Sequence, residues 1–126
     1  MHKSRLGALI IDCRTDDLPR EAAFWSAALG YEIAPPKPGN HGRYIGLVGP
    51  AGEVKIELQS VEHESREHLD IETDDFTAEI ARLEKLGATR VEAYPRWVVM
   101  EAPSGHRFCV VNPQREDFHE NAKEWR

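Results

Sequence analysis

The chain has 126 residues and a mass of 14.3 kDa, with 16 basic and 22 acidic side chains and a net charge of −6. This length fits one domain, and the sparse Lys and Arg residues exclude a nucleic-acid surface, which needs clustered basic side chains. The longest uninterrupted apolar stretches, Ala8–Ile11 and Trp97–Met100, are far shorter than the ~20 residues of a membrane-spanning helix.

The first part of the chain predicts a strand followed by a helix. The strand covers Leu6–Arg14, and Asp17 is placed to cap the helix that follows. Pro19 fits the first turn, where its missing N–H costs nothing. Apolar residues then recur at helical spacing until Gly30, a typical helix stop, and they form one stripe: Leu18, Ala22, Trp25 and Leu29.

Three short strands are predicted after this helix, at Tyr31–Ala34, Tyr44–Val48 and Val54–Val61. Residues 35–42, PPKPGNHG, form a long Pro/Gly-rich loop between the first two of these strands. His41 in this loop is a candidate to close over a ligand.

The second part of the chain repeats this order. A strand at His68–Thr73 leads into a helix capped by Asp75, whose apolar stripe ends before Gly87 and consists of Phe76, Ile80, Leu83 and Leu86. Three strands follow, at Thr89–Ala93, Trp97–Glu101 and Arg107–Val111. The charged residues from Gln114 to Arg126 are interpreted as a solvated tail, with a short helix as the alternative.

The two parts are related by an internal repeat. When the chain is shifted by 58 residues, residues 10–25 lie over residues 68–83, and six of the 16 positions are identical: Asp12/Asp70, Thr15/Thr73, Asp16/Asp74, Asp17/Asp75, Glu21/Glu79 and Ala23/Ala81. Chance would give about one identity. We therefore predict one domain built from two modules, at about residues 6–61 and 66–112, followed by the charged tail at 113–126.

The modules resemble a known family. The segments DCRTDDLPREAAFWSAALGY, HLDIETDDFTAEIARLEKLGA and WVVMEAPSGHRFCVV are similar to the vicinal oxygen chelate (VOC) superfamily, most of all to its glyoxalase-like branch related to bleomycin-resistance proteins. The resemblance implies an α+β fold of two tandem βαβββ modules, whose mixed sheets form a cleft. The superfamily includes lyases, epimerases, dioxygenases and non-catalytic drug-binding proteins, so it does not specify a reaction.

The resemblance also implies where a metal would bind. The family's four ligand positions fall on Ile10, Glu57, His68 and Cys109, and Ile10 is a hydrocarbon. We therefore favour a cleft without a complete metal site. The alternative is a divalent ion, such as zinc, held by Glu57, His68 and Cys109 with one open position.

The alternation of side chains along strands places a polar group on the face of the predicted cleft. Its members are Asp12, Arg14, Glu57, His68, Asp70, Glu72 and Arg107. His68, Glu57 and Asp70 are the candidate catalytic residues, with His68 as base and Glu57 orienting it. The candidate ligand-binding residues are Asp12, Arg14, Glu72, Trp97, Arg107 and Cys109. The alternative interpretation is that the carboxylates pair with Arg14, Arg107 or backbone amides and hold the two halves together.

The same alternation places Cys13 under the first helix and Cys109 on the cleft face, so a disulfide between them is not expected. We expect a cytoplasmic protein with free thiols. The favoured hypothesis is a protein that binds a small organic molecule in the cleft between its two modules, without a complete metal site. The resemblance also implies a homodimer. The alternative is an isomerase, epimerase or lyase that uses His68, Glu57 and Asp70 for proton transfer.

Overall fold

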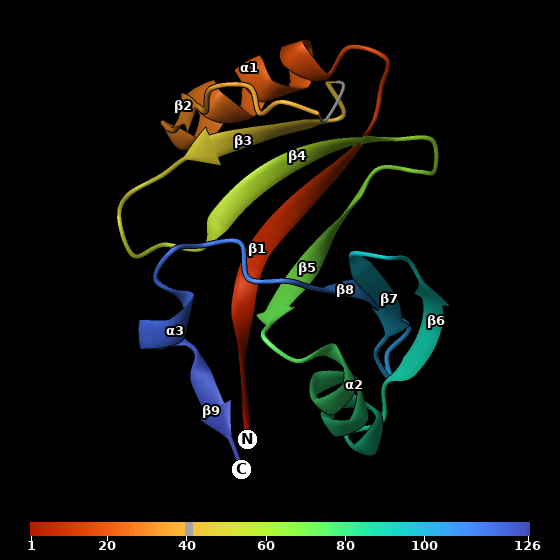
Figure 1. Ribbon diagram of the computed structural model, residues 1–126. Helices are drawn as coiled ribbons and strands as arrows, with labels where there is room; N and C mark the ends of the chain where they lie inside the picture. The colour runs from red at the N-terminus through yellow and green to blue at the C-terminus, as the bar shows by residue number, and fades with distance from the viewer. Residues whose placement is uncertain (40–41) are drawn as a thin grey trace. The chain divides into compact units, whose positions relative to one another are not determined.

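The computed structural model describes residues 1–39 and 42–126, which form two compact units (Figure 1). The first module consists of residues 8–67, and the second module consists of residues 68–126 together with residues 1–7. Strand β1 (His2–Arg14) contributes to both modules. Within the described parts of the chain, no helix is long and apolar enough to cross a membrane.

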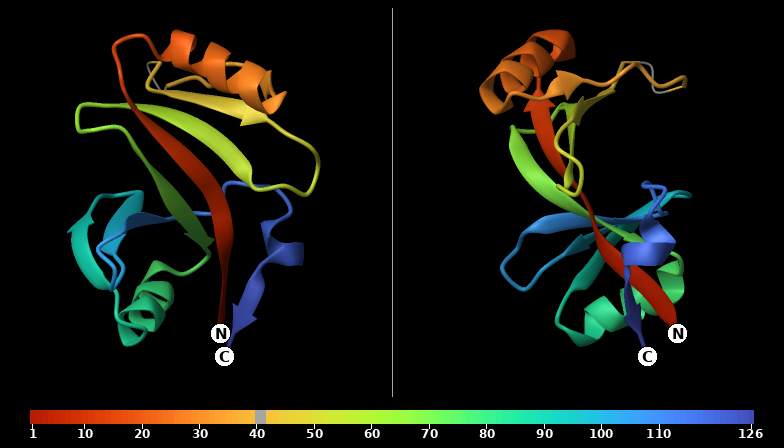
Figure 2. Two further views of the ribbon diagram at one scale, coloured as in Figure 1. Left: turned by 180° about the vertical axis from the view of Figure 1, so that it is seen from behind. Right: turned by 90° about the vertical axis from the view of Figure 1, so that its left-hand side faces the viewer.

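The first module is a four-stranded mixed sheet with one helix. After β1 come α1 (Leu18–Leu29), β2 (Glu32–Ile33), β3 (Tyr44–Val48) and β4 (Lys55–Val61), and the strand order is β2-β3-β4-β1. Strand β1 runs parallel to β4, and the other neighbours are antiparallel. Helix α1 packs against β3 and β4 (Figures 1 and 2). The core between helix and sheet contains Ile11, Cys13, Leu18, Ala22, Leu47, Ile56 and Leu58.

The second module repeats this topology. It contains β5 (Arg66–Thr73), α2 (Phe76–Lys85), β6 (Thr89–Ala93), β7 (Trp97–Glu101) and β8 (Arg107–Val111), in the order β5-β8-β7-β6. Strands β5 and β8 are parallel, like β1 and β4 in the first module. A second core lies under α2 and contains Ile80, Leu83, Ala88, Val98, Met100 and Val110. The predicted α+β fold of two βαβββ modules is therefore confirmed.

Both helices begin and end as the sequence predicts. The carboxylate of Asp17 accepts a hydrogen bond from the backbone N–H of Arg20, and Asp75 accepts one from Ala78. Gly30 has a φ of 72°, a conformation that glycine adopts without the steric cost of a side chain. Leu18 and Ala22 of the first predicted stripe and Ile80 and Leu83 of the second are buried, but Leu29 and Leu86, at the helix ends, are exposed.

The C-terminal segment differs from the sequence interpretation, because it is not a solvated tail. It forms the short helix α3 (Phe118–Asn121) and the strand β9 (Lys123–Trp125), which pairs antiparallel with residues 2–4 of β1. Phe118 is almost fully buried. Strand β1 consequently begins at His2 rather than at the predicted Leu6. The short helix given as the alternative is therefore present, and the burial of Phe118 and the pairing of β9 with β1 anchor this highly charged segment.

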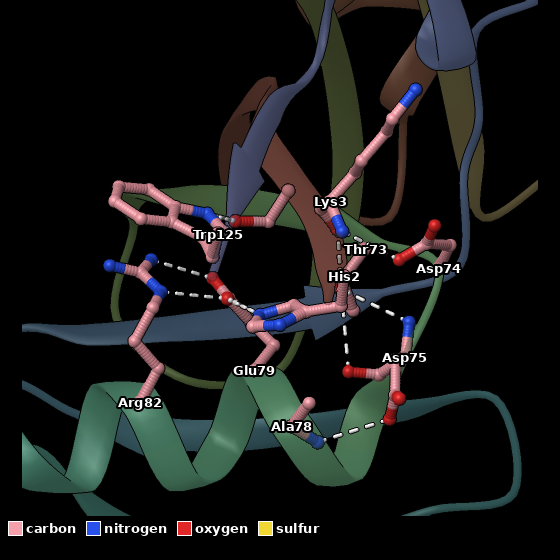
Figure 3. A network of polar contacts seen from close by, with 10 residues as sticks. His2, Lys3, Thr73, Asp74, Asp75, Ala78, Glu79, Arg82 and Trp125 are labelled. Atoms are coloured by element: carbon pink, nitrogen blue, oxygen red, sulfur yellow. Dashed lines mark hydrogen bonds and ion pairs between the residues drawn. The ribbon is translucent and has the colours of Figure 1, made fainter.

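A buried carboxylate joins both ends of the chain to α2 in the second module (Figure 3). Glu79 accepts two hydrogen bonds from Arg82, of 2.9 and 2.8 Å, and its Oε1 lies 2.8 Å from His2 Nε2. The Arg82 guanidinium lies 3.8 Å from the centre of the Trp125 ring, and the Trp125 indole donates to Ser4. Burial alone would raise the pKa of Glu79, but the hydrogen bonds from Arg82, His2 and Ser4 outweigh it and hold the pKa below its usual value.

We predict that Glu79→Gln destabilises the protein by about 2 kcal/mol at pH 7, because a hydrogen bond to a charged group contributes ~1.5–3 kcal/mol. The folded-state pKa of Glu79 is depressed, so its contribution is present above its ordinary pKa of 4.5 and is lost as the pH falls through the depressed value. Urea denaturation of wild type and variant should therefore show a difference that shrinks in acid. Glu84→Gln, on the exposed side of α2, is the control and should change stability by less than about 0.5 kcal/mol.

Candidate functional site

The first module contains a large pocket on the sheet beside the Pro-rich loop. Its volume is about 740 Å³, within the range of roughly 300–1,000 Å³ that is typical of small-molecule sites. Its walls come from β2, β3, the loop at residues 34–37 and the turn before β4. They are mostly apolar and include Ile33, Pro35, Pro36, Tyr44, Val48 and Val54. The sequence indicates the loop but not this pocket. The closely spaced prolines of the loop are the feature of the sequence that could have indicated the pocket.

Lys55 and Glu57 are polar groups of this pocket. They alternate with the core residues Ile56 and Leu58, so strand geometry turns them to the opposite face of the sheet. Lys55 Nζ lies 3.7 Å from Glu57 Oε2, and both side chains are about one-fifth exposed, at 22% and 19%. Burial lowers the pKa of Lys55, and the nearby Glu57 carboxylate partly offsets this effect.

The other candidate residues of the first module lie along β1. Ile10 is buried, and it stands opposite Glu57 in the parallel β1/β4 pairing. Asp12 is also buried, and its Oδ2 lies 4.0 Å from Arg66 Nε. The side chain of Arg14 is exposed at the end of the strand. The predicted His41 lies outside the described residues.

In the second module the structure brings together His68, Asp70 and Cys109. His68 and Asp70 are two residues apart on β5, and Cys109 stands opposite Asp70 on the parallel strand β8. His68 Nε2 lies 3.3 Å from Asp70 Oδ1, and one donor atom from each of the three residues lies within 4.8 Å of the others. All three residues are partly buried. They form a compact group of an imidazole, a carboxylate and a thiol.

Glu72, two residues further along β5, has a different environment. Its side chain is fully buried, and its carboxylate lies 2.6 Å from Arg5 Nε and 3.5 Å from Arg115 Nε. The other carboxylate oxygen accepts a hydrogen bond from the backbone N–H of Gln114. Glu72 therefore ties β5 to both terminal segments within the second module, through arginines other than the Arg14 and Arg107 of the alternative interpretation. The sequence analysis did not identify Arg5 or Arg115 as its partners.

Trp97 and Arg107 lie at the ends of neighbouring strands. The Trp97 ring stacks on Tyr94, with 4.6 Å between ring centres, and both rings are exposed at the β6–β7 turn. Arg107 is paired with Glu101 at 2.9 Å on the surface. Cys13 is buried in the first core, and neither cysteine forms a disulfide. The predicted orientation of His68 by Glu57 requires a contact between the two modules and stays a prediction.

The residues present do not complete the metal site that the VOC resemblance implies. Of the four expected positions, Ile10 offers no donor atom and is 2% exposed. His68 and Cys109 do offer donors, and Asp70 joins them as a third. The residues present therefore do not fit the four-ligand metal site predicted from the family. The group of His68, Asp70 and Cys109 lies within the second module alone.

The comparisons with known proteins agree with this architecture. The sequence matches the family model of the glyoxalase-like domain over residues 8–111. No curated protein matches it significantly.

Solved structures with a similar fold include methylmalonyl-CoA epimerase from Mycobacterium tuberculosis (16% identity, TM-score 0.61, 88% of this chain and 89% of that chain). Another is Streptomyces coelicolor methylmalonyl-CoA epimerase in complex with 2-nitronate-propionyl-CoA (15% identity, TM-score 0.59, 88% of this chain and 98% of that chain). A hypothetical protein from Bacillus halodurans is also similar (12% identity, TM-score 0.59, 90% of this chain and 96% of that chain). At these identities the likeness establishes the fold alone. The chain has a VOC-type fold, and because the family model covers most of its length, it belongs to the glyoxalase-like domain family.

Proposed function

We propose that this chain is a glyoxalase-like protein that binds a small organic molecule in the pocket of its first module. The pocket volume of about 740 Å³ is the observation that carries the proposal. A cavity of this size with apolar walls and a few polar groups is the usual form of a ligand site.

The pocket lining indicates the chemistry of the ligand. Its apolar walls suit a hydrocarbon or aromatic body, which gains ~25 cal/mol for each Å² of apolar surface removed from water. Lys55 can donate hydrogen bonds and Glu57 can accept them, and together they carry no net charge. A neutral or zwitterionic head group with both a donor and an acceptor therefore complements this pair better than a phosphate does.

Gly46 offers a way to close the pocket without disturbing the fold. It lies on β3 among the lining residues, and a Cβ added to it would meet only Ala34 Cβ, at an ordinary contact distance of 3.5 Å. We predict that Gly46→Leu fills the pocket and abolishes ligand binding. In a thermal-shift screen of metabolites, a ligand at 100 times its Kd stabilises a protein by about 2.7 kcal/mol, which raises Tm by several degrees. The variant should lose this shift.

The matched control is Ala28→Leu, which adds the same side chain at an exposed position of α1. This variant should keep the full ligand-induced shift. A shift that persists unchanged in Gly46→Leu would mean that the ligand binds elsewhere, and this part of the proposal would be wrong.

A second candidate function is an isomerase, epimerase or lyase. The observation that favours it is the His68–Asp70 pair, in which a carboxylate lies 3.3 Å from an imidazole nitrogen. Such a pair can orient the imidazole so that its other nitrogen removes or returns a proton. Several structures with this fold are named methylmalonyl-CoA epimerases, which supports proton transfer as a reaction type for this chain. Glu57 would assist only if it approaches His68 as the sequence predicts.

For this second function we predict that wild-type protein in deuterated water exchanges an acidic C–H of any ligand found in the screen. His68→Gln should slow the exchange by at least about 100-fold, because general-base catalysis contributes ~10²–10⁴-fold. Ligand affinity should change far less. Proton NMR measures the exchange, and His106→Gln, at an exposed turn, is the control. Equal exchange rates in wild type and His68→Gln would exclude His68 as the base.

A further inference from the structure

The pocket of the first module contains a lysine that is largely shielded from solvent. Lys55 lies on β4 and lines the pocket, and its side chain is only 22% exposed. The walls around it are mostly apolar, and such walls solvate an ammonium group less well than water does. They therefore favour the neutral amine, which is the form whose lone pair can attack a carbon atom.

The charged groups near Lys55 act on the same amine. Burial lowers the pKa of Lys55, the Glu57 carboxylate opposes this effect, and the Lys37 cation from the Pro-rich loop lowers the pKa as well. The net result is a pKa below the ordinary value of lysine. The other titratable side chains of the described lining are Glu53 and Tyr44. A desolvated lysine next to a second cation is an arrangement that makes lysine a nucleophile toward carbonyl compounds.

We propose that the Lys55 amine attacks the carbonyl carbon of a small aldehyde or ketone in this pocket and forms an imine with it. The inference rests on the proposed function of the pocket, and it names the class of ligand. A carbonyl compound with a hydrocarbon or aromatic body suits the apolar walls, and its oxygen is a neutral hydrogen-bond acceptor. No residue of the second module takes part.

The reaction needs neither an oxidant nor a reductant. The nitrogen lone pair forms a bond to the carbonyl carbon, the C=O π bond opens, and one N–H proton passes to the oxygen to give a carbinolamine. The hydroxyl group then leaves as water with the second N–H proton, and the C=N bond forms. Glu57 Oε2, 3.7 Å from Lys55 Nζ, is placed to carry these protons, because a carboxylate can accept a proton from nitrogen and return it to oxygen.

Reductive trapping in the full chain tests this chemistry. The protein is incubated at pH 7 with benzaldehyde and sodium cyanoborohydride, which transfers hydride to the imine carbon and fixes the probe as a secondary amine. Peptide mass spectrometry then gives the trapping rate of each lysine. We expect Lys55 to react at least about tenfold faster than the exposed Lys85 and Lys123, because a pKa that is lower by one gives about tenfold more neutral amine.

Glu57→Gln tests the proton transfer and keeps the shape of the side chain. Trapping at Lys55 should slow by at least about tenfold, because general acid–base catalysis contributes ~10²–10⁴-fold. If Glu57 only paired with the ammonium group, its removal would lower the pKa of Lys55 further and speed the trapping. Faster trapping in this variant would therefore overturn the role of Glu57.

Gly46→Leu, which fills the pocket, should slow trapping at Lys55 to the rate at Lys85, and Ala28→Leu on α1 is its control. Circular dichroism checks that each variant is folded. The inference is overturned if Lys55 in wild type is trapped no faster than Lys85. In that case a thermal shift with benzaldehyde that Gly46→Leu removes would leave ligand binding in the pocket intact. Fast trapping that persists in Gly46→Leu would overturn both the inference and the proposed function.

Discussion

The parallel pairing between the first and last strands of each module determines which side chains meet. In the first module β1 pairs with β4, and in the second β5 pairs with β8. Side chains alternate between the two faces of a strand. Each register therefore brings the polar side chains of the two paired strands together on one face and turns the other face toward the core. Ile11 and Cys13 consequently pack under α1, while Glu57 points away from that core.

The two modules pair different residues across their parallel strands. Glu57 stands opposite Ile10, the repeat mate of His68, whereas Cys109 stands opposite Asp70, the repeat mate of Asp12. The first module thereby places Glu57 at a mostly apolar pocket, and the second brings His68, Asp70 and Cys109 close together. Two copies of one topology thus carry different polar side chains on equivalent strands.

The second module also depends on its buried carboxylates. Glu72 and Glu79 are both fully buried, and burial of an unpaired carboxylate would be strongly unfavourable. Their partners Arg5, Arg115 and His2 come from segments outside the family match at residues 8–111. The two ends of the chain therefore supply hydrogen-bond and ion-pair partners for carboxylates of the domain. Because Glu72 lies on the same strand as His68 and Asp70, these contacts also stabilise the strand that carries this pair.

Local patterns in the sequence were sufficient to predict most helices and strands of the fold. The repeat, the Asp caps and the terminating glycines identified both helices, and alternation identified most strands to within a residue or two. These signals are local, because a cap or an alternating strand involves residues that are neighbours in the chain. The resemblance added the topology and the residues His68, Glu57 and Cys109.

Only the tertiary structure decided the partners of the charged residues. Arg5 with Glu72 and His2 with Glu79 are separated by 67 and 77 residues, and no periodicity in the sequence predicts such pairs. The pocket and the addition of Asp70 to the thiol group follow from strand register and from the packing of a loop, which are contacts across the chain. By itself the sequence determined which segments become helices and strands. The fold determined which of their side chains meet, because long-range contacts arise from packing and not from local spacing.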